Sequence, residues 1–373
     1  MPDSSGENES SLPVRSADPP ANPTGEKKTF VPERDIEPHI LAKLDPEWVA
    51  LFTEQMNTSP PPPRELLSME YIRAHPEKFA PPCWLDTKGY PRTAEKEVVS
   101  EDGATVPTRV YYPEEKVWGP GPYPVHLNFH GGGFVLGGLQ NESTLCMSMC
   151  DGAGVAVVDV NYRHCPETVF GKCFQDAFAA LNWARNNAES LNFEPSSISF
   201  GGISAGGTIS LTLQHMARDA GIPIKLVMPS VPGCDPGLSY KFYTDSSRPS
   251  FHEFYRGPVL PWASIKWFGS LSQPPEKQQE LKAMWPDWYF TPFKAKNFKG
   301  LCPVFIRTAK CDPLRDEGEA YGRKLVEEGV QVTVKRYLGS VHTFMSVKEF
   351  HRKQEYDADA IAALKAAHGT KLK

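Results

Sequence analysis

A serine flanked by glycines is the residue whose setting most directly suggests chemistry in this sequence. It stands in the pattern Gly202-x-Ser204-x-Gly206, between a short apolar run and a helical one. A serine on a sharp strand-to-helix turn needs small residues two positions away on either side, because larger ones would clash with neighbouring backbone. The following helix would also point its N-terminus at the site and stabilise negative charge there. We therefore expect Ser204 to be a nucleophile. The alternative is a glycine-rich turn without function, because this short pattern also occurs by chance.

A second glycine run strengthens this interpretation. The segment His130–Phe134 reads His-Gly-Gly-Gly-Phe and follows the apolar strand predicted at Val125–Phe129. Acyl transfer creates an oxyanion that backbone N–H groups can bind, and we expect these donors at Gly131, Gly132 and Ala205. A flexible glycine hinge is the alternative, but it does not explain the order of the two motifs. The residues expected to support the motifs are His130, Gly133, Gly202 and Gly206.

A serine is a poor nucleophile unless a histidine, oriented by a carboxylate, removes its proton. Asp312 and His342 fit these roles, because they follow the strands predicted at Pro303–Thr308 and Val330–Tyr337. Their order after Ser204 is that of α/β-hydrolases. The rival acids begin the next helix, where a carboxylate has a structural reason to lie, and the rival histidines lie in helices or in the tail. These rivals are Asp316, Glu317, His215, His351 and His368.

From about residue 95, short β-rich runs alternate with helical segments, which indicates a mostly parallel sheet covered by helices. The other expected strands are Val106–Tyr112, Val155–Val160, Ile198–Gly201 and Ile224–Ser230. The expected helices are Phe170–Asn187, Ser204–Arg218, Glu317–Glu328 and Val347–Leu364. The α/β catalytic domain is therefore predicted over residues 95–234 and 299–373.

The remaining segments are predicted to form a tail and a cap. Residues 1–30 are polar, and we expect a disordered tail there. Residues 31–94 are predicted to be an N-terminal part of a helical cap, with helices at Asp45–Phe52 and Arg64–Ile72. Between the helices, Pro60–Pro63 is expected to be a rigid loop, with polyproline binding as the alternative. Residues 235–298 carry many aromatics among prolines, and we expect an inserted cap in which a few of these face the substrate.

These residues together resemble the hormone-sensitive-lipase-like group of α/β-hydrolases, which includes many carboxylesterases. His130–Gly133 is similar to that group's oxyanion motif, Asn161–Glu167 resembles its Tyr-Arg-Leu-Ala-Pro-Glu segment, and Asp312–Gly318 resembles its acid motif. The resemblance implies an eight-stranded sheet, and a cap made from N-terminal helices and an insertion before the acid strand. It also implies Ser204 as nucleophile, Asp312 as acid and His342 as base. Arg163 and Glu167 are expected to be structural anchors.

The sequence departs from this family at two places. Ile203 replaces the usual Asp before the nucleophile, and His164-Cys165 replaces the usual Leu-Ala. Neither position belongs to the predicted triad. Ile203 removes a charge beside the site, so we expect a more apolar pocket.

Composition excludes several classes of function. The chain has 373 residues and a formal net charge of −5, without a dense run of Lys or Arg, which argues against nucleic acid as a partner. No apolar stretch predicts a membrane span or a secretory signal. The eight cysteines form no CxxC pairs, and Cys146 with Cys150 lacks a second pair, so we expect reduced thiols, no metal and a cytoplasmic location.

The leading hypothesis is hydrolysis of a small apolar or aromatic carboxylic ester or lactone through an acyl-enzyme on Ser204, without a cofactor. A second hypothesis uses the same triad for amide cleavage, acyl transfer or a non-hydrolytic step on a biosynthetic intermediate of secondary metabolism. A third is a receptor without catalysis, since plant gibberellin receptors are similar to this family. Those receptors lack the catalytic histidine, whereas His342 is present here. A homodimer is compatible with the sequence, which does not determine the oligomeric state.

Overall fold

A computed structural model describes residues 29–60, 68–79 and 90–373 of the chain. Within these residues the strands form an eight-stranded sheet with the order β1-β2-β4-β3-β5-β6-β7-β8. β2 is antiparallel to both of its neighbours, and all pairs from β4 to β8 are parallel. The predicted α/β-hydrolase fold is confirmed. The strands are β1 Thr93–Val99, β2 Thr105–Tyr111, β3 Tyr123–Phe129, β4 Ala156–Val160, β5 Phe193–Ile203, β6 Leu226–Ser230, β7 Val304–Cys311 and β8 Val332–Val341.

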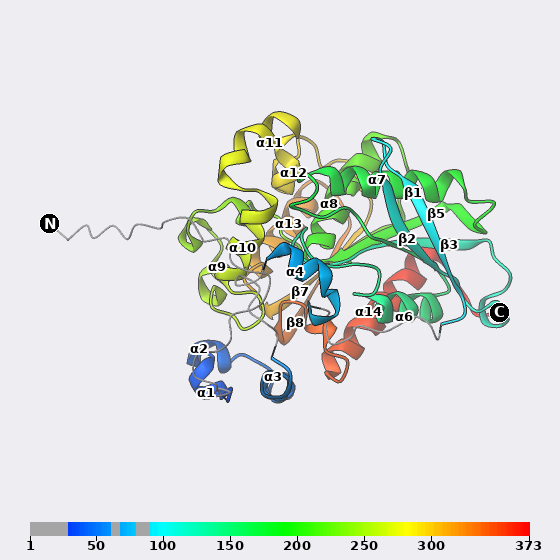
Figure 1. Cartoon of the computed structure of the whole chain (residues 1–373). Coiled ribbons are helices and arrows are strands. Elements are labelled where there is room, and N and C mark those ends of the chain that lie inside the picture. Colours follow the sequence, from blue (N-terminus) through cyan, green and yellow to red (C-terminus); the bar gives the residue numbers. More distant parts are fainter. Residues whose placement is uncertain (1–28, 61–67, 80–89) are drawn as a thin grey trace.

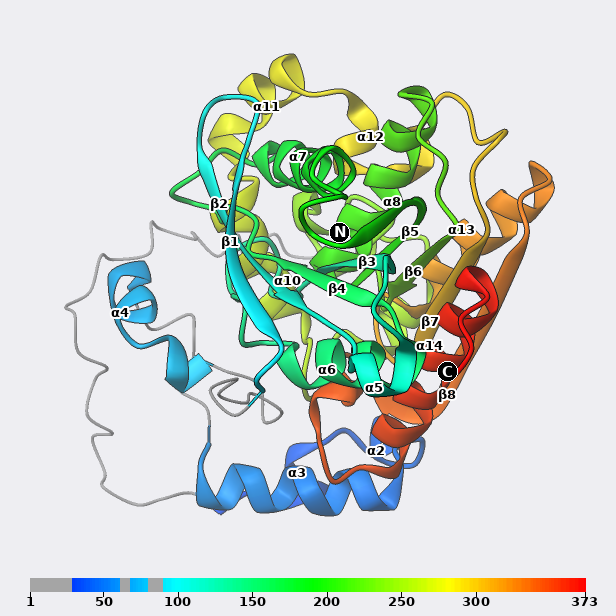
Figure 2. The same ribbon diagram turned by 90° about the vertical axis from the view of Figure 1, so that its right-hand side faces the viewer.

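The central strands are apolar because helices cover both faces of the sheet (Figure 2). Every residue of β4 and β6 is buried, as expected for parallel strands that pack on two sides. Helices α7, α8 and α13 cover one face, and α6 and α14 cover the other. These helices are α6 Ser143–Ala153, α7 Lys172–Asn186, α8 Ala205–Asp219, α13 Arg315–Glu327 and α14 His351–His368, and a short helix α5 spans Glu115–Trp118.

The segment between β6 and β7 is helical, as predicted for residues 235–298 (Figure 1). Its aromatic side chains pack onto the first turn of α7 and the loop just before it, with Phe290 stacked on Phe170 and Tyr289 edge-on to Phe174. Its action as a lid stays a prediction. The helices here are α9 Pro249–Phe254, α10 Trp262–Ser272, α11 Gln278–Met284 and α12 Asp287–Phe290, and those of the N-terminal region are α1 Pro32–Asp35, α2 Pro38–Leu41, α3 Pro46–Thr58 and α4 Met69–Ala74.

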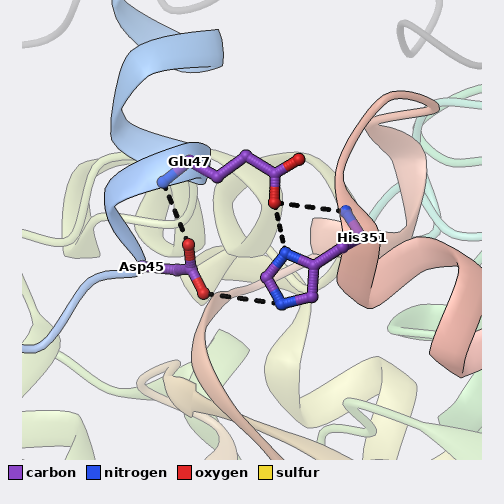
Figure 3. Close-up of side chains that lie close together, drawn as sticks. All are labelled: Asp45, Glu47 and His351. Atoms are coloured by element: carbon purple, nitrogen blue, oxygen red, sulfur yellow. Dashed lines mark hydrogen bonds and ion pairs between the residues drawn. The ribbon is translucent and has the colours of Figure 1, made fainter.

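The start of α3 is fastened to the body of the molecule (Figure 3). Asp45 caps α3, because its carboxylate accepts from Glu47 N at 3.0 Å, while Asp45 N donates to Gly339 O at 3.0 Å. At the start of α14, His351 Nδ1 bonds to the Glu47 carboxylate, and Nε2 lies 3.7 Å from Asp45 Oδ2. The hydrogen bond from His351 lowers the pKa of Glu47. An imidazole between two carboxylates therefore joins α3 to α14.

Several expected boundaries were wrong in a way that matters for the site. β7 continues to Cys311 and β8 to Val341, so Asp312 and His342 follow their strands directly. Lys310 and Gly339 interrupt the apolar pattern of these strand ends, but the pairing resumes at Cys311 opposite Val341 after an irregularity. β1 and α6 were not identified from their sequences. The expected tail up to residue 28, residues 61–63 of the proline run, and residues 64–67 of the expected second cap helix lie outside the described residues.

Candidate active site

Ser204 lies on a sharp turn between β5 and α8. Its backbone has φ 55° and ψ −115°, an unusual conformation for a residue other than glycine. The turn is tight enough that a Cβ on Gly202 would lie 2.3 Å from Phe129 O, and one on Gly206 only 1.8 Å from the same atom. Both glycines are therefore required by close backbone approach, which is the reason that the sequence pattern suggested.

The three predicted catalytic side chains lie in one hydrogen-bonded chain. His342 Nε2 is 2.9 Å from Ser204 Oγ, and His342 Nδ1 is 2.8 Å from Asp312 Oδ2. Asp312 is fully buried and His342 is 4% exposed. The other carboxylate oxygen of Asp312 accepts from Leu314 N at 2.9 Å, which fixes the carboxyl plane. A carboxylate accepting at Nδ1 leaves Nε2 free to accept the hydroxyl proton.

The rival residues have other partners. Asp316 accepts from Ser250 N at 2.8 Å, and Glu317 accepts from Cys234 N at 3.0 Å, so both hold the chain that leads into the inserted segment. Among the rival histidines, His215 bonds to the Tyr321 hydroxyl, His351 faces Glu47 and Asp45, and His368 bonds to Ser197 and Ser199.

The glycine loop differs from expectation at one residue. Gly131 N donates to Glu142 Oε1 at 2.8 Å, so this N–H is not available to an oxyanion. The role predicted for Gly131 is therefore wrong, because its N–H already donates to the buried carboxyl group of Glu142. The N–H groups of Gly132, Gly133 and Ala205 have no acceptor among the residues that the structure describes. Gly132 and Gly133 adopt φ 126° and 61°, which favour glycine.

Glu142 belongs to a buried acidic cluster behind this loop. Asn128 Nδ2 donates to Glu142 Oε2 at 3.0 Å and to Asp159 Oδ1 at 2.9 Å. Burial raises the pKa of Glu142 to about 8, with a further contribution from Asp159, and burial raises the pKa of Asp159 to about 7. Sequence reasoning missed Glu142. The only signal was an acidic residue among small polar ones shortly after the glycine run.

A cavity of about 1220 Å³ opens above Ser204 and His342. Ile203 lines it beside the nucleophile, so the departure from the family places an aliphatic side chain here. The cavity wall is largely apolar, and some of its side chains come from the inserted segment, as expected. Prominent lining residues are Phe134, Phe170, Leu260, Phe268, Tyr289 and Phe290.

The two polar anchors behave as structural residues. Arg163 donates from Nε to the buried Asp176 and from Nη1 to Asp102 at 2.9 Å. Glu167 pairs with Arg73 of α4, with Nη2 and Oε2 2.8 Å apart, and so links the N-terminal region to the loop that follows β4. Sequence reasoning missed Arg73, for which no local pattern gave a signal.

The structure gives limited scope for a metal. Among the described residues, one group of three potential ligands has its ligand atoms within 4.8 Å of one another, namely Asp45, Glu47 and His351. Both imidazole nitrogens there already face carboxylates, which an ion pair explains. Cys146 and Cys150 lie one turn apart in α6, and burial raises the pKa of both thiols. Within the described part of the chain, no helix has the length and apolar character needed to cross a membrane.

Comparison with known proteins supports the same assignment. A protein-family profile described as "alpha/beta hydrolase fold" matches residues 126–346, which is more than half of the chain. This chain belongs to the α/β-hydrolase fold family. Its relatives in the family include an AB hydrolase superfamily protein of Schizosaccharomyces pombe, 32% identical over 91% of this chain and 98% of the relative. Carboxylesterase NlhH of Mycobacterium tuberculosis is 35% identical over 68% of this chain and 75% of that protein.

Solved structures of family members agree in fold. An α/β-hydrolase enzyme from the metagenome of Lake Arreo has a TM-score of 0.77 at 28% identity, covering 88% of this chain and 100% of that one. An esterase of Pyrobaculum calidifontis has a TM-score of 0.72 at 26% identity, and the match covers 87% of this chain and 98% of that one. The predicted membership in the carboxylesterase branch of the α/β-hydrolases is confirmed, and the protein is a carboxylesterase-like hydrolase.

Proposed function

We propose that this hydrolase cleaves small carboxylic esters through an acyl-enzyme on Ser204. The observation that carries the proposal is the continuous hydrogen-bonded chain from Ser204 through His342 to the buried Asp312. That chain supplies a nucleophile, a base and a group that orients the base, which ester hydrolysis at neutral pH requires. A pure receptor would have no need for all three.

In the proposed reaction, Ser204 Oγ attacks the ester carbonyl carbon while its proton moves to His342 Nε2. The tetrahedral intermediate collapses, and the protonated His342 gives its proton to the leaving alcohol. A water molecule, deprotonated by His342, then attacks the acyl-enzyme carbonyl, and the acid leaves as Ser204 regains its proton. Throughout, Asp312 stabilises the imidazolium and keeps its orientation.

The oxyanion would be bound by the N–H groups of Gly132, Gly133 and Ala205. These three donors have no acceptor among the described residues, and all three residues line the cavity with Ser204. Ala205 also begins α8, whose N-terminus favours negative charge nearby. Losing one such donor typically costs about 3 kcal/mol of barrier stabilisation. Gly133 therefore replaces Gly131 in the proposed set.

The cavity supports an apolar or aromatic substrate. Its aromatic and aliphatic walls would stabilise such groups by burial, at about 25 cal/mol per Å² of apolar surface. Ile203 beside the nucleophile supports this preference, because it replaces a charge with an aliphatic side chain. Lactones fit the same chemistry, since ring opening uses the same acyl transfer.

The test is a panel of nitrophenyl esters with acyl chains of different lengths, assayed with native protein and with Ser204→Ala. We expect turnover by the native protein and none above background by the variant. If both proteins hydrolyse no ester although both are folded, the proposal fails. If the protein turns over only an amide or a biosynthetic intermediate, the second hypothesis is supported, in which the same triad performs a different reaction.

A further inference from the structure

Two histidines lie directly behind the glycine loop. His130 has none of its surface exposed, and its Nδ1 lies 2.8 Å from Gly131 O. On the opposite side of the ring, His130 Nε2 lies 3.3 Å from Nε2 of His164. The ring also stacks on Tyr162 with centroids 4.4 Å apart, and the Tyr162 hydroxyl donates to His130 O at 2.8 Å. The plane of the His130 ring is therefore fixed, and both of its nitrogens are engaged.

The chemistry of the partners gives these two hydrogen bonds a direction. A carbonyl oxygen only accepts, so His130 Nδ1 must carry a proton. Burial lowers the pKa of His130 to about 4, so the ring is neutral at neutral pH and its Nε2 holds a lone pair. His164 Nε2 must then be the donor. The hydrogen bonds run from His164 to His130 and from His130 to Gly131 O.

This arrangement orients the peptide that carries one of the proposed oxyanion donors. The C=O of Gly131 and the N–H of Gly132 belong to one planar trans peptide and point in opposite directions. Because His130 holds the carbonyl on its own side, the N–H points away from the histidines. Gly132 and Ser204 line the same cavity. Because the glycine backbone is the most flexible of all residues, a contact from outside the loop is needed to hold the Gly132 N–H in one orientation.

His164 is held against the same loop by its neighbours. Cys165 N donates to Phe134 O at 2.8 Å. The Arg73 guanidinium joins the two segments, because it donates to Cys165 O at 3.0 Å and to Val135 O at 2.6 Å. These contacts fix the backbone that follows each of the two histidines.

Burial is the main reason that both histidines favour their neutral forms. Burial lowers the pKa of His164, and the nearby His130 and Arg73 lower it further. At His130 burial outweighs the hydrogen bonds to Gly131 and Asn161, which raise its pKa. A neutral His164 can donate from Nε2 only if its proton is on that nitrogen, so the relay requires one tautomer at each ring.

We propose that His164 is a positioning residue for the esterase reaction. By donating to His130 it selects the tautomer that binds Gly131 O, and so it aims Gly132 N–H at the developing oxyanion. The proposal rests on the proposed function, because it requires an oxyanion at this place. The corresponding segment of the resembling family has leucine here, which has no N–H to donate, so the relay is a property of this chain's own sequence.

The kinetic test compares His164→Leu with His164→Gln. Gln can place an amide N–H near the position of Nε2, whereas Leu has no donor. We expect His164→Leu to lower kcat about tenfold, less than the loss of a whole oxyanion donor, with little change in KM. His164→Gln should stay within about threefold of the native kcat. A trifluoromethyl ketone inhibitor binds as an oxyanion adduct, so its affinity for each variant should fall in parallel with kcat/KM.

Equal activity and equal inhibitor affinity of native protein and His164→Leu would overturn the proposal. A fall of kcat in both variants, together with a lower thermal stability of both, would also overturn the proposal, because the loss of packing alone would then explain the lower activity.

The tautomer itself is measured by ¹⁵N NMR of histidine-labelled protein. In the native protein we expect His130 to be protonated at Nδ1 and His164 at Nε2, and in His164→Leu we expect His130 to lose its single Nδ1–H form. A native His130 protonated at Nε2 would overturn the proposal even if His164→Leu does not fold. This measurement needs no substrate, so failure of the relay is distinguishable from failure of the esterase function.

Discussion

Asp312 is the residue whose role depends most on its surroundings. It is fully buried, and one oxygen accepts from His342 Nδ1 while the other accepts from Leu314 N. Asp316, four residues later, instead accepts from Ser250 N. Two nearby carboxylates therefore have different tasks, which makes them a matched pair for a test.

Asp312→Asn should keep the shape of the site but allow the wrong tautomer of His342, because an amide can donate to Nδ1. We expect kcat for a short nitrophenyl ester to fall about 10⁴-fold. The control is Asp316→Asn, which should keep more than about a tenth of the native kcat, since Asp316 does not contact His342. Equal losses in the two variants would contradict the assignment of the acid.

At the scale of single residues, the triad could be predicted from residue types and their order. Ser204, Asp312 and His342 each follow a strand, and parallel strands bring their carboxyl ends to one edge. The partner of Gly131 could not be predicted, because Glu142 reaches the loop through tertiary packing. The pairing of His130 with His164 was hidden for the same reason, although the unusual His164 had been noticed.

At the scale of elements, the turn between β5 and α8 depends on glycine. Gly206→Ala would place a Cβ 1.8 Å from Phe129 O, which is backbone and cannot move aside. We expect a loss of at least about 3 kcal/mol in the free energy of unfolding, measured by urea denaturation, or no folded protein. Gly138→Ala is the control, since its Cβ would meet only Gln140 Oε1 at 3.5 Å. A stable Gly206→Ala would show that the turn is looser than described.

Arg73 of the short helix α4 is hydrogen-bonded to the loops that follow β3 and β4. Arg73 donates to Val135 O, Cys165 O and both carboxylate oxygens of Glu167. Arg73→Ala should therefore cost about 1–2 kcal/mol and expose the N-terminal region to limited proteolysis. Glu167→Gln keeps the two carbonyl contacts and should be cleaved more slowly than Arg73→Ala. Identical proteolysis of native protein and Arg73→Ala would contradict this role.

Element types were predicted better than element limits. The central apolar strands and the helices α7, α8 and α13 have clear periodicity in the sequence. α6 was missed because Ser143–Ala153 mixes small polar residues with cysteine and methionine, and β1 because most of its residues are polar or exposed. Edge strands bury one side at most, so their sequences carry a weaker signal.

At the scale of the whole molecule, Glu142 links stability to pH. Its pKa in the folded protein is about 8, above the usual value of 4.5, because burial and Asp159 disfavour its charge. The folded state therefore binds more protons than the unfolded state between these pH values. The stability from the protonated side chain is fully present below the unfolded pKa and is lost as pH rises through the folded pKa.

Glu142→Gln remains neutral at every pH, so it should not show this loss. We expect native protein to lose free energy of unfolding relative to the variant between about pH 5 and about pH 9, measured by urea denaturation. Glu189→Gln, at an exposed position of the same chain, should follow the native curve. Parallel curves for native protein and Glu142→Gln would show that Glu142 does not titrate as described.

The whole account depends on Ser204 being the nucleophile of the site at the cavity. The most direct measurement is labelling with a fluorophosphonate, which reacts with activated serines, followed by mass spectrometry of the digested protein and an assay of residual esterase activity. We predict one label per chain, located on the peptide that contains Ser204, with activity lost in proportion to labelling and no reaction in Ser204→Ala. A label on another residue, or full activity after Ser204 is modified, would contradict the account.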